Sequence, residues 1–114
     1  MERVQVEEKG HVLTVDISQE VTMEVVNDLK KDFEGFFSGS WQVLALDLSE
    51  VSFMDSAGIG FVTALNNRSL QEGRIFCLLN PSEQVIKTLK LVNLWDLFQV
   101  HQSLDEIFRL YPAE

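Results

Sequence analysis

The chain has 114 residues, with 9 Lys and Arg against 18 Asp and Glu, which gives a formal net charge of −9 at pH 7. We expect residues 1–114 to form a single domain, because 46% hydrophobic residues are enough for a core at this length. The acidic balance argues against binding to nucleic acid and to anionic membranes, since both require clustered Lys and Arg. No apolar run is long enough to span a membrane or to act as a signal peptide, so we expect a cytoplasmic protein.

The first part of the sequence predicts a hairpin followed by a helix. The alternating residues around Val4 and Val6 and those of 12–17 are separated by a turn signal ending in Gly10. From about Thr22, apolar residues recur every three or four positions until residues 35–39, which predicts an amphipathic helix. The apolar positions of this helix are Val25, Val26, Leu29, Phe33, Phe36 and Phe37.

Residues 43–46 form a nearly continuous apolar run, which is typical of a strand covered on both faces. This run is the best candidate for the central strand. After a loop over residues 50–55, helical spacing continues to Gly73, which suits the position just after a helix. Residues 74–79 then predict another strand.

The last part of the sequence predicts two further helices around a short strand. Asn80 and Pro81 predict the N-cap and the first residue of a helix. Residues 97–100 predict the strand, and Ser103 with Glu106 has the spacing of a capping box for the last helix.

The predicted element order is therefore ββαβαβαβα, an α/β fold. Strands that alternate with helices pair in parallel through helical crossovers, whereas the opening hairpin adds an antiparallel edge. We expect a mixed, mostly parallel sheet with helices packed on it.

The sequence offers no enzymatic, metal or cofactor constellation. Cys77 lies in an apolar run, which favours a buried hydrophobe over a reactive thiol. His11 and His101 lack other ligands at metal-binding spacing. The glycines at 58 and 60 resemble the start of a dinucleotide fingerprint, but Thr63 stands where the third glycine is needed. Met54 stands where a nucleophile elbow before Ser56 requires glycine.

The informative segment is residues 47–60, where Asp-Leu-Ser follows the central strand and Val-x-Phe-x-Asp-Ser-x-Gly-x-Gly leads into a helix. This pattern resembles the signature of the STAS domain, the fold of the SpoIIAA-like anti-sigma factor antagonists of bacteria. The order of the predicted elements also resembles that family, so the resemblance covers most of the chain.

The resemblance implies a protein–protein switch with no catalytic activity of its own. The phosphorylated serine of the family corresponds to Ser56. The unphosphorylated form would bind an anti-sigma factor that is itself a serine kinase and so free a sigma factor. Phosphorylation would end this binding, and a PP2C-type phosphatase would restore it.

The residues themselves leave two interpretations of this turn open. The Ser56 hydroxyl suits an N-cap, which is a purely structural role, or a phosphoacceptor that a helix N-terminus tolerates. Asp55 suits an Asx-turn with its own backbone, or orients the loop or the serine. Gly58 and Gly60 allow a partner to approach closely or allow tight packing, with packing favoured for Gly60.

The residues that we expect to contact a partner are Met54, Asp55, Ser56, Ala57, Gly58 and Ile59. Phe53 is a further apolar candidate, although a core position is favoured for it. Ala57 stands where some family members have a second hydroxyl residue, so one phosphorylation site is expected. Residues 15–20 supply acids but lack the glycine that the family places beside the phosphosite, which weakens the case for kinase recognition.

An alternative function remains open within the same family. Some STAS proteins are non-enzymatic subunits of larger assemblies, such as a stressosome-like particle or a lipid-transport ABC complex. In such a subunit, the turn at Ser56 would be an interface without phosphoryl chemistry.

Overall fold

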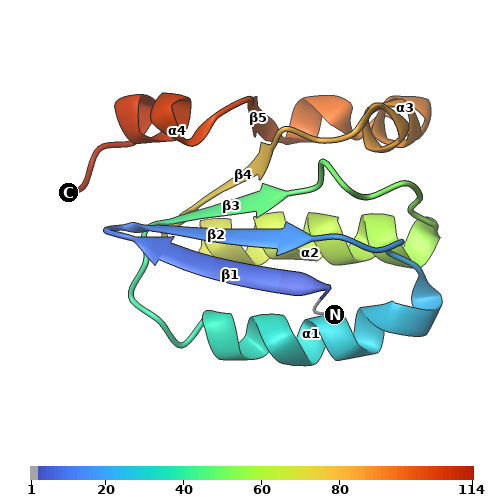
Figure 1. The fold of residues 1–114 in the computed structure, drawn as a ribbon, viewed down its shortest axis with the longest axis horizontal. Coiled ribbons are helices and arrows are strands. Elements are labelled where there is room, and N and C mark those ends of the chain that lie inside the picture. Colours follow the sequence, from blue (N-terminus) through green and yellow to red (C-terminus); the bar gives the residue numbers. More distant parts are fainter. Residues whose placement is uncertain (1–2) are drawn as a thin grey trace.

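The structure is a computed structural model that describes residues 3–114. It contains a five-stranded sheet in the order β1-β2-β3-β4-β5, with β1 antiparallel to β2 and the other neighbours parallel (Figure 1). The strands are β1 (Val4–Lys9), β2 (Val12–Ile17), β3 (Val43–Asp47), β4 (Ile75–Leu79) and β5 (Gln99–His101). The helices are α1 (Met23–Phe36), α2 (Ser56–Gln71), α3 (Glu83–Leu91) and α4 (Leu104–Leu110), with a 3₁₀ turn η1 (Trp95–Leu97) before β5. The predicted α/β fold and its element order are confirmed.

The central strand is β3, as predicted. Its residues alternate between two cores, because successive side chains of a strand point to opposite faces. Leu44 and Leu46 join the larger core with buried residues of α1, α2 and α3. Val43 and Ala45 join a smaller core against Ile107 of α4. These four residues of β3 are at most 1% exposed, which explains why the run is apolar throughout.

The start of α3 differs from the prediction. Its N-cap is Ser82, whose hydroxyl accepts from the N–H of Val85 at 3.2 Å and donates to the carbonyl of Val51 at 2.6 Å. Asn80 instead adopts φ 48°, a left-handed conformation that Asn tolerates, and turns the chain out of β4. Pro81 therefore precedes the helix and is not its first residue.

The last strand is also displaced from the predicted residues 97–100. Leu97 ends the 3₁₀ turn, and pairing with β4 begins at Gln99 and continues to His101. The N–H of Glu106 donates to the Ser103 hydroxyl at 3.2 Å, as a capping box requires. The Glu106 carboxylate lies 2.8 Å from Nδ1 of His101 and is not bonded to the backbone of Ser103. Half of the predicted capping box is thus formed.

The cysteine is buried, and both histidines lie within hydrogen-bond distance of Tyr111. Cys77 is fully buried, and burial raises the pKa of its thiol to about 12. His101 is 7% exposed and its Nε2 lies 2.8 Å from the hydroxyl of Tyr111, while Nε2 of His11 lies 2.6 Å from the Tyr111 carbonyl oxygen. Within residues 3–114, no group of His, Cys, Asp and Glu has a metal-binding arrangement, and no helix is long and apolar enough to cross a membrane.

Candidate functional site

The turn between β3 and α2 is organised by one carboxylate. Asp55 is the N-cap of α2, and its Oδ1 accepts from the N–H of Gly58 at 3.0 Å. Its Oδ2 accepts from the N–H of Met23, the first residue of α1, at 2.9 Å. These bonds from Met23 and Gly58 favour the charged form and hold the pKa of Asp55 below its usual value. Asp55 thus forms the Asx-type cap and also joins the starts of two helices.

Ser56 is the first residue of α2, so the interpretation of Ser56 as the N-cap is wrong. Asp55 takes the capping role because its carboxylate accepts two backbone N–H groups with a full charge, which a hydroxyl cannot match. The Ser56 side chain is exposed, and its hydroxyl makes no hydrogen bond with any residue in the range 3–114. The hydroxyl is therefore both accessible and unused by the fold.

The turn is held against the segment that leads into α1. The N–H of Val21 donates to the carbonyl of Phe53 at 3.0 Å, and the N–H of Asp55 donates to the carbonyl of Val21 at 3.3 Å. A Cβ added at Gly58 would collide with the Val21 carbonyl oxygen, whereas one added at Gly60 would meet nothing within 4 Å. Tight packing therefore requires glycine at Gly58, and the expectation that favoured packing at Gly60 is wrong.

The apolar surface beside Ser56 differs from the expected one. Met54 is only 3% exposed because its backbone pairs with Val21 and its side chain joins the core, so it offers little surface to a partner. Phe53, for which a core position was favoured, is 51% exposed. Met23, whose N–H donates to Asp55, is 73% exposed.

The remaining predicted contact residues, Ala57 and Ile59, are half-buried against the larger core. The sequence analysis missed Val21 and Met23. Nothing local in residues 18–23 indicates pairing with residues 53–55, because that pairing joins distant parts of the chain.

Because Asp55 caps α2 in its charged form, its contribution to the stability of the protein should depend on pH. An acid whose pKa is lower in the folded state stabilises the protein above its unfolded pKa, and this contribution is lost as the pH falls through the folded pKa. We expect Asp55→Asn to lower the Tm at pH 7, and the difference from the unmodified protein to shrink below about pH 4. Calorimetry at a series of pH values would measure it.

Asp96→Asn is the matched control, because Asp96 is exposed and its side chain makes no hydrogen bond to residues 3–114. A Tm difference for Asp55→Asn that is as small as the control's at pH 7 would contradict the capping role.

A protein-family model supports the resemblance to the STAS domain. The model of the STAS domain matches residues 3–107. A proposed anti-sigma factor antagonist from Thermotoga maritima is 27% identical over 90 residues, covering 78% of this chain and 80% of that protein. A homologue from Thermotoga neapolitana is 26% identical over 90 residues, with the same coverage of 78% and 80%.

Solved structures share the fold. The crystal structure of a proposed anti-sigma factor antagonist from Thermotoga maritima has a TM-score of 0.86 at 22% identity, covering 96% of this chain and 95% of that one. The unphosphorylated form of the anti-sigma factor antagonist SpoIIAA has a TM-score of 0.78 at 21% identity, covering 97% and 98%. The phosphorylated form of the Bacillus protein SpoIIAA has a TM-score of 0.71 at 21% identity, covering 95% and 99%.

Proposed function

The chain belongs to the STAS domain family, and from this premise we propose that it is an anti-sigma factor antagonist switched by phosphorylation of Ser56. In its unphosphorylated form, it binds an anti-sigma factor that is itself a serine kinase. Phosphorylation of Ser56 ends the binding, and a PP2C-type phosphatase restores it. The protein acts in the cytoplasm as the substrate of these enzymes and has no catalytic activity of its own.

The proposal rests on one observation, that Ser56 is exposed and its hydroxyl makes no hydrogen bond to residues 3–114. A phosphoacceptor must reach the active site of a kinase, and a hydroxyl engaged in a helix cap is held back by its hydrogen bond. Asp55 supplies the cap of α2, and Ser56 is left exposed without a hydrogen bond to residues 3–114. Its modification therefore removes no interaction on which the fold depends.

The position of Ser56 also lets the fold tolerate a phosphate. Ser56 begins a helix of 16 residues, whose N-terminal dipole and free N–H groups favour a negative group. Asp55 and the net charge of −9 repel the phosphate, but both effects are screened by solvent at an exposed position. We therefore expect the phosphorylated domain to remain folded.

The surroundings of Ser56 suit an interface that a phosphate disrupts. The exposed side chains of Phe53 and Met23 offer apolar contacts. Residues 47–62, and residues 18–23 that pair with this turn, contain no Lys or Arg that could pair with the phosphate. Desolvating an unpaired dianion against a partner should cost roughly 2–5 kcal/mol, or about thirtyfold to several-thousandfold in affinity.

The test combines phosphorylation with binding. The protein is incubated with ATP and a candidate anti-sigma factor kinase from the same genome, and the modified residue is located by mass spectrometry. We expect one phosphate, on Ser56, and a loss of kinase binding of at least about thirtyfold. Ser56→Ala should still bind but resist inactivation, and Ser56→Asp should bind weakly while its thermal unfolding stays cooperative.

Ser52→Ala is the matched control, since Ser52 is another exposed serine of the same loop. This variant should bind the kinase and be phosphorylated on Ser56 like the unmodified protein. Phosphate on a different residue would contradict the switch. Undiminished binding by the Ser56-phosphorylated form would favour a subunit of a larger assembly instead.

A further inference from the structure

Among residues 3–114, the strand β1 has a pairing partner on one side of its backbone alone. In its pair with β2, the N–H of Ser18 donates to the carbonyl of Arg3 at 2.9 Å, so the backbone of Arg3 faces β2. In an antiparallel pair, successive residues direct their N–H and C=O groups alternately toward the neighbouring strand and away from it. The N–H and C=O groups of Val4, Val6 and Glu8 therefore point to the open edge of the sheet.

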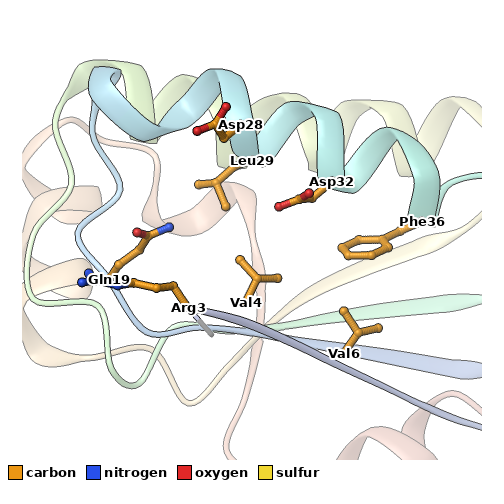
Figure 2. A pocket seen from close by; sticks show the side chains of 8 residues that line it. All are labelled: Arg3, Val4, Val6, Gln19, Asp28, Leu29, Asp32 and Phe36. Carbon is orange, nitrogen blue, oxygen red and sulfur yellow. The ribbon is translucent and has the colours of Figure 1, made fainter. Parts of the chain in front are cut away.

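A groove of about 410 Å³ lies between this edge strand and α1. Figure 2 shows Val4 and Val6 pointing from β1 toward α1, and Leu29 and Phe36 pointing from α1 back toward the strand. Val6 is 46% exposed, although its side chain is on the face that carries the larger core. The groove therefore has apolar side chains on both walls, beside a row of free backbone groups. Arg3 and Gln19 also line it.

Two carboxylates border the same groove. Asp28 and Asp32 are one helical turn apart on α1, and both are exposed (Figure 2). Within residues 3–114, no Lys, Arg or His nitrogen lies within 4.0 Å of either carboxylate. Like charges at this spacing repel one another on a helix, so a cation placed between them would be favourable.

We propose that the open edge of β1 and this groove bind an extended segment of a partner protein as an additional β-strand. The backbone of the segment pairs with the free groups of Val4, Val6 and Glu8. Its inward side chains alternate between aliphatic residues, which enter the groove, and Lys or Arg, which meet Asp28 and Asp32.

The charge of the chain selects this occupant over a second copy of β1. Two copies would each bring a net charge of −9, and each β1 contains Glu7 and Glu8. A basic segment gains from the same charges. The surface uses none of residues 53–59, so the proposal stands or falls independently of the switch at Ser56.

The probe is a fluorescein-labelled synthetic peptide, acetyl-Arg-Thr-Val-Thr-Lys-Thr-Val-Thr-amide, in which Arg, Val, Lys and Val share one face of a strand. Its control peptide carries Glu in place of Arg and Lys. We expect fluorescence anisotropy to show saturable binding of the basic peptide at concentrations below about 1 mM and no binding of the acidic one. Added salt should weaken the binding, because exposed charges are screened.

Two variants test the two parts of the site. Val6→Pro removes an N–H that points away from β2, a position where edge strands accept proline, and should abolish binding while the protein stays folded. The double variant Asp28→Asn with Asp32→Asn should weaken binding at least about tenfold. Asp96→Asn with Asp105→Asn is its matched control, since it removes the same charge from exposed positions on η1 and α4.

Several results would overturn the proposal. They are the absence of saturable binding up to about 1 mM, equal binding of the two peptides, or wild-type affinity in the Asp28 and Asp32 double variant. Sedimentation that shows a dimer of the unmodified protein and a monomer of a folded Val6→Pro variant would assign the edge to a second copy instead.

Discussion

Leu46→Ala is expected to lower the free energy of unfolding by about 2–5 kcal/mol. Leu46 is fully buried in β3, the central strand, and lies between Val15 of β2 and Leu78 of β4 in the sheet register. Removing its branched end leaves a cavity that neighbours on two strands and the helices above cannot fill without moving together. Urea unfolding followed by circular dichroism would measure the loss.

Leu70→Ala makes the same chemical change at a position that is 64% exposed on α2. Its expected cost is below about 0.5 kcal/mol. Equal and small effects of the two substitutions would contradict the central placement of β3.

Gly58→Ala should destabilise the protein by about 1–3 kcal/mol or more, because the added methyl group collides with a backbone carbonyl. That carbonyl, of Val21, accepts from the N–H of Asp55 at 3.3 Å, so it cannot withdraw without disturbing the cap of α2. We expect a lower Tm, and also weaker partner binding, because the turn that presents Ser56 must shift.

Gly60→Ala is the control in the same helix. Nothing lies within 4 Å of an added Cβ there, and alanine favours the helix over glycine by about 0.5–1 kcal/mol. This variant should be as stable as the unmodified protein or more so. A reversed order of the two variants in thermal unfolding would show that the segment at Val21 does not press on α2.

The order and type of the elements could be predicted because they depend on local patterns. Residues 43–46 are apolar on both faces of a strand, and the buried positions Val26, Leu29 and Phe33 of α1 have helical spacing. Gly73, predicted to follow α2, has φ 71° and the left-handed conformation that suits glycine at a helix end. These patterns can be recognised without knowing which distant residues the segments contact.

The errors in the helix starts arose where two residues close together in the sequence suit the same role. Asp55 and Ser56 are both good N-caps, as are Asn80 and Ser82. The choice between them depends on partners far along the chain. The Asp55 carboxylate also accepts a hydrogen bond from the N–H of Met23, and the Ser82 hydroxyl also donates one to the carbonyl of Val51.

The exposure of Phe53 and the burial of Met54 depend in the same way on long-range contact. Met54 forms an isolated parallel bridge with Val21, and the alternation of a paired segment then turns its neighbour outward. Neither residue carries a signal of this bridge in its own sequence neighbourhood.

The buried thiol of Cys77 can serve as a probe of local opening in the domain. Cys77 lies on β4 beside Ala45 of β3, in the smaller core that α4 covers, so a maleimide can reach it only when this part of the domain opens. Its rate of alkylation therefore reports how often this region opens under native conditions, and ligands of the folded state should slow the reaction. The same inertness lets a dye be attached to a cysteine introduced on the surface without first removing the native one.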